Sequence, residues 1–197
     1  MTNQKNKTIN QLIEVRLEKL NKIKNLGYNP YPHSFIKEDN IEDIIKKFSK
    51  DKKIKTAGRI IAFRKMGKAS FIHILGKKEK IQVYIKTDLI PENIYDDIVR
   101  NLDIGDIVGV EGKLFYTKTN ELSIKASNLI LLSKSIRPLP NLKEKDGKVF
   151  FAFEDKELKY RKRYLDLIAN KKVKDIFFLR SGIINQIRLF LNNVDFL

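Results

Sequence analysis

The sequence has no cysteine and only two histidines, His33 and His73. Without cysteine, the chain cannot form disulfides, the usual cysteine-containing zinc sites or a Cys–His nucleophilic pair. Its longest uninterrupted apolar run, Val149–Phe153, covers five residues, whereas a membrane-spanning helix needs about 20. The start of the chain, MTNQKNKTIN, contains no apolar core region, so we expect no secretory signal peptide. These absences predict a globular, cytoplasmic protein.

The chain has few acidic residues for its number of basic ones. Among 197 residues, 40 are Lys or Arg and 24 are Asp or Glu, which gives a formal net charge of +16. A compositional bias toward Lys, Asn and Ile could explain much of this charge. The distribution is more informative, because residues 54–87 hold nine basic residues and one acidic residue, whereas residues 88–133 hold four and eight. A basic segment that also carries aromatic residues is typical of a surface that binds a polyphosphate chain.

Familiar catalytic and cofactor-binding patterns are also missing. A phosphate-binding P-loop needs glycine at position 62 and Ser or Thr at position 69, where this chain has Ala62 and Ala69. Gly105, Gly109 and Gly112 fall inside a predicted strand pair, so bulges or a tight bend explain them better than dinucleotide binding. Two histidines without cysteine give no convincing metal site. We therefore expect no catalytic residue, metal or cofactor in this chain.

Residues 1–53 are predicted to be a helical extension. Apolar residues recur at helical spacing over Thr8–Leu26, with Thr8 and Gln11 as a capping box and Gly27 as the stop signal. A second, shorter helix is predicted over Asp39–Phe48. The basic side chains of the first helix lie mostly off its apolar stripe. A solvated face explains them better than contact with a nucleic-acid backbone.

From residue 54 onward, apolar residues alternate with a period of two, which indicates strands. The predicted order is three strands, one helical segment and two further strands. In chain order these are Ile54–Lys65, Ser70–Leu75, Lys80–Lys86, the helical Pro91–Leu102, Ile107–Thr117 and Glu121–Ser133. This is the order of an OB-fold, a small five-stranded Greek-key barrel. We therefore predict an α+β, mainly β chain with an OB-fold barrel at residues 54–134 and helices on either side.

Residues 135–156 are predicted to be a linker, although its apolar run Val149–Phe153 should pack on something. Helices are expected over Lys156–Ile168 and Lys174–Asn193, so that residues 157–197 form a last, helical segment. The apolar stripe of the second helix is too wide for one face in water and needs a large partner surface. Because no partner domain follows, we expect the chain to be a truncated portion of a longer protein.

The outer face of the second and third strands is the usual ligand face of an OB-fold. Alternation places Phe71, His73, Gln82 and Tyr84 on this face, with Arg64 and Lys68 alongside. The expected nucleic-acid contacts therefore include Lys68, His73 and Tyr84.

The candidate residues differ in the roles that the pattern allows them. Phe71 could stack on a base or belong to the core. Gln82 can read a base edge, because its amide both donates and accepts hydrogen bonds. His73 is more typical of a surface residue than of a base reader. Glu121, just past the last turn, could accept from a base or be a solvated strand end.

Six short blocks of this sequence occur in the same order in class II lysyl-tRNA synthetases. They are Met66–Phe71 (MGKASF), Ile81–Tyr84 (IQVY), Gly105–Gly109 (GDIVG), Thr117–Ser123 (TKTNELS), Arg137–Pro140 (RPLP) and Tyr160–Leu167 (YRKRYLDL). The chain resembles that family from about Gly58 to its end. Aspartyl- and asparaginyl-tRNA synthetases share the barrel type, but the MGKASF, TKTNELS and RPLP to RYLDL blocks are more similar to the lysine enzyme.

The resemblance implies that residues 54–134 are an anticodon-binding barrel. Phe71 matches the aromatic residue that stacks on an anticodon base, and Gln82 matches the glutamine that reads the middle uracil. Arg64 matches an arginine that works with them, and Glu121 matches a glutamate that helps to read the uracil-rich anticodon. Residues 174–197 resemble the start of the catalytic domain, including a helix that forms the homodimer interface in that family.

The sequence departs from the family pattern at several positions. Asn120 and Asp195 stand where glycine is usual, Leu75-Gly76 replaces a polar turn, and residues 143–153 are unlike the family linker. The motifs that hold ATP and magnesium and activate lysine are not present in these residues. We therefore expect a portion of a lysine–tRNA ligase that binds tRNA(Lys) without catalysis. A non-enzymatic single-stranded nucleic-acid-binding OB module, or a truncated paralogue, is the alternative.

Overall fold

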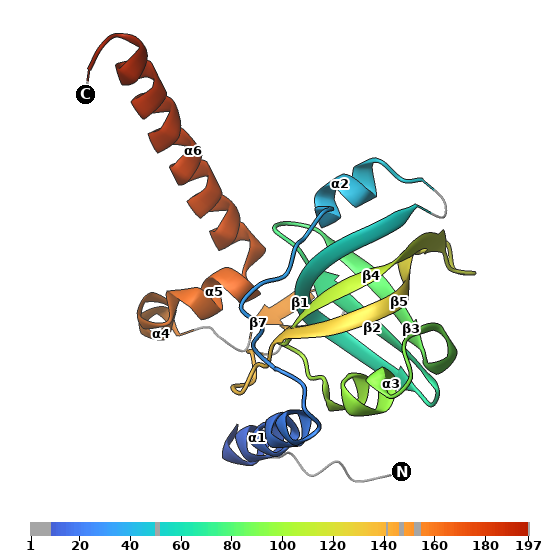
Figure 1. The fold of residues 1–197 in the computed structure, drawn as a ribbon. Coiled ribbons are helices and arrows are strands. Elements are labelled where there is room, and N and C mark those ends of the chain that lie inside the picture. The colour runs from blue at the N-terminus through green and yellow to red at the C-terminus, as the bar shows by residue number, and fades with distance from the viewer. Residues whose placement is uncertain (1–8, 50–51, 141, 146–147, 152–154, 197) are drawn as a thin grey trace. The chain divides into compact units, whose positions relative to one another are not determined.

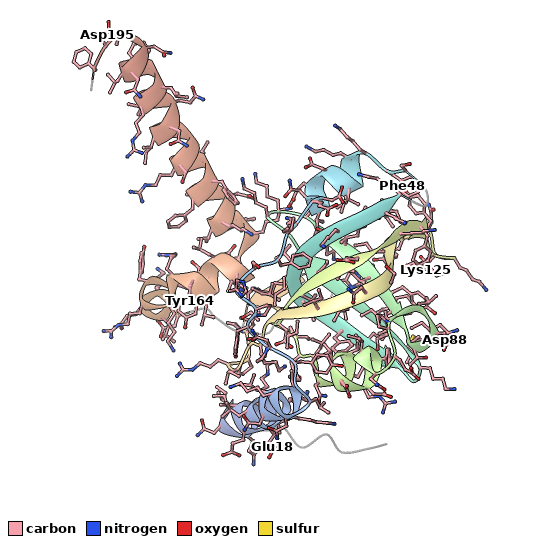
Figure 2. All side chains as sticks on the ribbon, viewed as in Figure 1. Glu18, Phe48, Asp88, Lys125, Tyr164 and Asp195 are labelled. Carbon is pink, nitrogen blue, oxygen red and sulfur yellow. The ribbon has the colours of Figure 1, made fainter. Side chains whose placement is uncertain are left out.

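The computed structural model (Figures 1 and 2) describes residues 9–49, 52–140, 142–145, 148–151 and 155–196. The chain forms two compact units that divide between Pro138 and Leu139. The first contains a closed β-barrel and two helices that precede it, and the second contains a hairpin and three helices.

Five strands close the barrel in the order β1-β2-β3-β5-β4, with β4 pairing back onto β1. They are β1 (Lys53–Met66), β2 (Ala69–Leu75), β3 (Lys80–Lys86), β4 (Ile107–Tyr116) and β5 (Leu122–Ser133). The β3–β5 pair is parallel and the other four pairs are antiparallel. The predicted OB-fold is confirmed, with strand ends within about one residue of the predicted ones.

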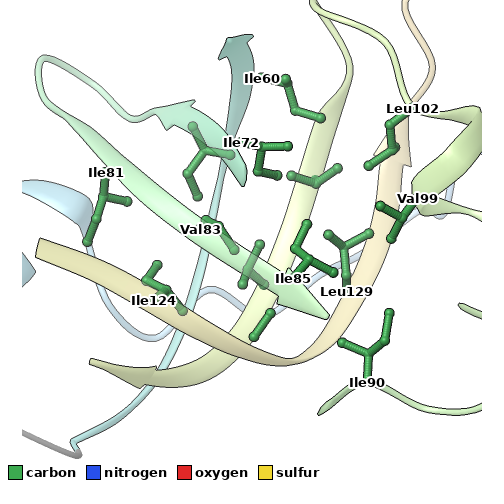
Figure 3. Packing of buried hydrophobic residues seen from close by; sticks show 14 of the residues in the cluster. Ile60, Ile72, Ile81, Val83, Ile85, Ile90, Val99, Leu102, Ile124 and Leu129 are labelled. Carbon is green, nitrogen blue, oxygen red and sulfur yellow. The ribbon is translucent and has the colours of Figure 1, made fainter. Parts of the chain in front are cut away.

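The barrel core follows directly from the period-two pattern. In β2, Ile72 and Ile74 are fully buried, and in β3 the same is true of Val83 and Ile85. Their neighbours in sequence point outward and are half-buried. Figure 3 shows how these side chains meet those of β5 and of the segment between β3 and β4. Burial of each such side chain contributes about 1.5–3 kcal/mol.

The segment between β3 and β4 is helical but broken. The structure has three separate turns here, of which only the last two lie within the predicted helical stretch Pro91–Leu102. They are η1 (Thr87–Leu89), α3 (Ile94–Asp97) and η2 (Val99–Asn101). Asn93 has a φ of 70°, a left-handed conformation that prevents a helix from starting earlier. Tyr95 and Val99 still enter the barrel core.

Helix α1 (Ile9–Asn25) matches its prediction, and Leu20 and Ile23 are its buried residues. Its end is a Schellman motif: Gly27 has a φ of 84°, its N–H donates to Lys24 O at 2.9 Å, and the Tyr28 N–H donates to Ile23 O at 3.3 Å. The predicted cap residue Thr8 lies outside the described residues.

Helix α2 (Ile41–Lys46) is shorter than the predicted Asp39–Phe48. Asp39 is not part of it, because its side chain accepts a hydrogen bond from the Lys55 N–H of β1 at 3.1 Å. Burial tends to raise the pKa of Asp39, but the bonds from Lys52 and Lys55 outweigh it and leave that pKa below its usual value. Asp39 therefore joins the helical extension to the barrel.

One glycine of β4 is required by close packing. A Cβ on Gly112 would lie 2.3 Å from the carbonyl oxygen of Lys125 on β5, and the β4–β5 register shifts between Glu111 and Gly112. Of the two explanations predicted for these glycines, a bulge or a tight bend, the register shift supports a bulge at Gly112. Gly109 instead faces the ring of Phe35, which a Cβ would meet at 2.5 Å.

A buried charge cluster lies between β5 and the turn before β4. The ammonium group of Lys134, fully buried, lies 2.5 Å from Asp103 and 2.8 Å from Asp106. Burial tends to raise the pKa of Asp103, but hydrogen bonds from Lys134 and Lys19 outweigh it and lower that pKa. At Asp106, burial prevails over the attraction of Lys134 and raises the pKa.

The second unit contains more structure than the predicted linker suggests. Strands β6 (Leu142–Lys145) and β7 (Lys148–Phe151) form an antiparallel hairpin within it. The predicted packing of Val149–Phe153 lies outside the described side chains.

Three helices follow: α4 (Lys156–Arg161), α5 (Arg163–Ala169) and α6 (Lys171–Asn193). The predicted helix Lys156–Ile168 is broken at Lys162, whose φ and ψ are −116° and 49°. Helix α6 begins earlier than predicted, because the Asn170 side chain caps it by accepting from the Val173 N–H. Asp195 has a φ of 62°, so it takes the left-handed conformation that favours glycine.

Candidate nucleic-acid interface

Four predicted site residues form a block on the outer face of β2 and β3. Phe71 pairs with Tyr84 across the strands, and His73 pairs with Gln82. All four side chains are half-buried. The rings of Phe71 and Tyr84 have centroids 5.0 Å apart and planes inclined by 39°. Phe71 is therefore part of an outer aromatic surface, and the alternative that it belongs to the core is wrong.

A third aromatic residue extends this surface. The ring centroid of Phe115, from β4, lies 6.2 Å from that of Tyr84 in an edge-to-face arrangement at 63°. Phe115 is also half-buried. Such rings offer the flat apolar surfaces on which nucleic-acid bases stack.

A polar network lies beside the rings. The Nε2 of Gln82 donates to Oε2 of Glu121 at 2.7 Å, and the Ser123 hydroxyl donates to Oε1 of Gln82 at 2.9 Å. The Nε2 of His73 lies 2.9 Å from Oε1 of Glu121. Three side chains that the sequence predicted separately, His73, Gln82 and Glu121, are therefore in direct contact.

The turn between β4 and β5 positions Glu121. The Thr117 N–H donates to Glu121 O at 3.1 Å, and the Asn120 N–H donates to Thr117 O at 2.9 Å. The Thr117 hydroxyl accepts from the Glu121 N–H at 3.1 Å. Asn120 adopts a φ of 59°, so it supplies the left-handed residue that this turn needs in place of glycine. The Glu121 side chain is 47% exposed and remains open to a ligand.

The Glu121 carboxylate fixes the orientation of the Gln82 amide, because an ionised carboxylate only accepts hydrogen bonds. An amide has two N–H donors and two acceptor lone pairs, and Glu121 and Ser123 take one of each. One donor and one acceptor remain for a ligand. If the amide flipped, its oxygen would face the Glu121 carboxylate, which offers only acceptors when ionised. The site can therefore recognise a planar group whose edge presents an acceptor next to a donor.

Residues 54–132 match the tRNA anti-codon family model, which is described as an OB-fold nucleic acid binding domain. This segment is similar to that family, and its closed five-stranded barrel is the OB-fold that the description names. It covers all five strands of the barrel and the complete aromatic and polar surface described above.

Curated relatives match this chain beyond the OB domain. It is 41% identical to the lysine–tRNA ligase of Azobacteroides pseudotrichonymphae over 90% of this chain and 37% of that protein. It is 41% identical to the lysine–tRNA ligase of Buchnera aphidicola over 98% of this chain and 39% of that protein. For the lysine–tRNA ligase of Carboxydothermus hydrogenoformans, the identity is 42% over 96% and 38%. The chain thus spans less than two fifths of the length of these relatives.

The two remaining predicted residues lie at the edge of the OB domain's aromatic surface. Arg64 of β1 pairs with Phe71 across the strands and is exposed. Lys68 is exposed in the turn between β1 and β2, where its carbonyl oxygen accepts from the Thr87 N–H at 3.1 Å. Both basic residues are therefore exposed at the edge of this surface.

Sequence reasoning missed Ser123 and Phe115. Ser123 is fully buried, and its position opposite Gln82 depends on the parallel β3–β5 pairing. Its place in the TKTNELS block, two residues after Glu121, was the available signal. Within the described ranges, no helix is long and apolar enough to cross a membrane. No group of three or more His, Cys, Asp or Glu side chains there is suited to a metal ion.

Proposed function

We propose that this chain recognises the anticodon of tRNA(Lys) as part of a lysine–tRNA ligase. The observation that carries the proposal is the fixed amide of Gln82 beside the ring surface of Phe71 and Tyr84. The similarity to three lysine–tRNA ligases over at least 90% of this chain supports it.

The amide of Gln82 is suited to uracil in particular. The pairing edge of uracil presents a carbonyl acceptor next to an N–H donor, which complements the donor and acceptor that Gln82 retains. Cytosine presents the opposite order, an amino donor next to a ring acceptor. The amide would have to flip to pair with it, and Glu121 opposes that flip. A good two-bond contact of this kind is worth about 1–3 kcal/mol of discrimination.

The ring of Phe71 supplies the affinity that the amide alone lacks. Stacking of one base on an aromatic side chain contributes about 1–3 kcal/mol whatever the base. Since Phe71 and Gln82 come from neighbouring strands, one nucleotide can stack while the amide reads a base edge. Arg64 would then meet a phosphate beside the stacked base.

The chemistry of the ligase is assigned to residues beyond this chain. The complete enzyme would use ATP and magnesium to activate lysine, and we propose that this chain alone catalyses no lysine-dependent exchange of pyrophosphate into ATP. The homodimer that the resemblance implies and the cytoplasmic location predicted from the composition belong to the same proposal. Measurable lysine-dependent exchange by the 197-residue chain would contradict the proposal that this chain binds tRNA without activating lysine.

Binding of labelled anticodon stem-loops at fixed salt tests the proposal against its alternatives. The loops carry UUU for lysine, GUU for asparagine and GUC for aspartate. A lysine-specific site binds UUU most tightly. A preference for GUU or GUC would indicate the asparagine or aspartate relatives. Because all three loops have uracil in the middle, a UCU loop is titrated beside them, and equal, strongly salt-dependent binding of all four would indicate a general single-strand binder.

A further inference from the structure

Phe71 and Tyr84 are paired across neighbouring strands, and three exposed lysines occupy the paired positions on the next three strands around the barrel. They are Lys125 of β5, Lys113 of β4 and Lys53 of β1, called here the lysine row. We infer that the lysine row binds phosphates of an RNA strand that continues past Tyr84. This inference deepens the proposed function and rests on it, because it adds a backbone site to the base-reading site.

The strand registers place the row without a gap. Phe71 pairs with Tyr84, Tyr84 with Lys125, Lys125 with Lys113, and Lys113 with Lys53. Directly paired residues lie on the same face of a sheet, so the rings and the lysines share the outer face of the barrel. Figure 2 labels Lys125 at this outer surface.

The lysine row carries charge that nothing described in the protein neutralises. All three side chains are exposed. In the part of the chain that the structure describes, none of them makes a hydrogen bond or an ion pair. Like charges directly opposite each other on neighbouring strands destabilise a sheet, and the row contains two such pairs. An anionic ligand would relieve this repulsion.

A surface hollow lies along the row. It has a volume of about 630 Å³ and is lined by all three lysines together with Lys55, Glu38 and Glu111. Glu111 is already paired with Lys55 at 2.8 Å, and that hydrogen bond raises the pKa of Lys55. Four lysines against two carboxylates leave the lining positive, which suits a phosphate rather than a cation.

The lysine row is long enough to contact the nucleotides that the two aromatic rings cannot stack. Three strand spacings separate Tyr84 from Lys53, or about 14 Å at roughly 4.8 Å each. OB-folds bind about 4–16 nucleotides, more than the Phe71–Tyr84 pair can stack. A strand whose bases occupy the rings can therefore pass its next phosphates over β5, β4 and β1.

The test compares two double variants of the full chain. Lys113→Gln/Lys125→Gln removes two charges from the row, and Lys22→Gln/Lys24→Gln removes two exposed charges from α1 as the matched control. Binding of the UUU stem-loop is titrated at several salt concentrations. The slope of log affinity against log salt should fall by about 0.7 per lysine in the row variant only. At about 0.1 M salt, this corresponds to roughly fivefold weaker binding per lysine.

Equal losses in the row and control variants, or an unchanged slope in the row variant, would overturn the inference. Thermal denaturation checks the fold, and the row variant should be at least as stable as the wild type because a repulsion is removed. A UCU stem-loop distinguishes a failure of the anticodon proposal from a failure of the lysine-row inference. If the wild type binds UUU and UCU equally, the anticodon proposal fails, whereas the slope still decides the lysine row.

Discussion

The Nε2 atom of Gln82 in β3 donates a hydrogen bond to Oε2 of Glu121 over 2.7 Å. Glu121 directly precedes β5, which lies beside β3 through their parallel pairing. This contact fixes which end of the amide donates and which accepts. A flexible glutamine could turn to pair with either uracil or cytosine, but one held in this way offers a donor and an acceptor in the order that complements uracil and not cytosine approaching in the same orientation.

Replacing Glu121 by glutamine should release that constraint. The new amide can donate or accept, so Gln82 becomes free to adopt either orientation. We expect the ratio of dissociation constants for UCU and UUU stem-loops to fall about tenfold, which corresponds to about 1.4 kcal/mol within the range for a two-bond contact. Affinity for UUU should change less. Glu14→Gln on α1, an exposed position, is the control, and an unchanged ratio in the Glu121 variant would remove the orienting role.

Gln82→Ala should reduce discrimination at the middle base more than it reduces affinity. The substitution removes the donor and the acceptor but leaves the rings of Phe71 and Tyr84 in place. Titration of stem-loops with all four middle bases measures both effects. Equal losses for all four would show that Gln82 contributes only general binding.

Phe71→Ala should weaken binding of the UUU stem-loop by about 1–3 kcal/mol, with little change in preference among bases, because stacking is tolerant of sequence. Phe48→Ala is a matched control, since the Phe48 ring contacts that of Tyr116 in a tilted arrangement, with centroids 4.7 Å apart, and lies outside the proposed site. An unchanged affinity in a folded Phe71 variant, shown by circular dichroism, would exclude the stacking role.

Lys134→Met should destabilise the barrel by about 3–5 kcal/mol at neutral pH, because it leaves Asp103 and Asp106 without their buried cation. Denaturant titration measures the loss. Lys22→Met, at an exposed position of α1, should change stability by less than about 0.5 kcal/mol.

The pH dependence of this loss follows from the two carboxyl groups. The lowered pKa of Asp103 contributes stability that is present above its unfolded-state pKa and is lost as the pH falls through its folded-state pKa. The raised pKa of Asp106 has the opposite effect, so its stabilisation is present at low pH and is lost as the pH rises through that value. In Lys134→Met the deficit should shrink toward acidic pH, because protonation removes the uncompensated charges. A deficit that does not change between neutral pH and about pH 4 would contradict this explanation.

Much of the barrel could be predicted because buried and outward-facing residues alternate along its strands. The alternation that buries Ile72 and Val83 is visible in the sequence and also places Phe71, His73 and Gln82 on the outer face. The breaks at Asn93 and Lys162 could not be predicted, since each depends on the backbone conformation of a single residue. The β6–β7 hairpin was missed because its strands are only four residues long.

The site was harder to predict from the sequence than the barrel, because it depends on pairing between strands that are distant in the sequence. Glu121 reaches Gln82 only through the β3–β5 pairing, and the resemblance, not the alternation, singled it out. Ser123 and the lysine row were missed for the same reason. In particular, Lys53 and Lys113 become neighbours only where β4 closes the barrel against β1.

The most direct test of anticodon recognition is a binding titration of the wild-type chain with two stem-loops at one salt concentration. One loop carries UUU, and the other differs only in having C as the middle base. The fixed amide of Gln82 predicts binding of UUU that is tighter by about tenfold or more, since about 1.4 kcal/mol of discrimination corresponds to a factor of ten. Equal affinities would contradict the proposal that this OB domain reads the anticodon of tRNA(Lys).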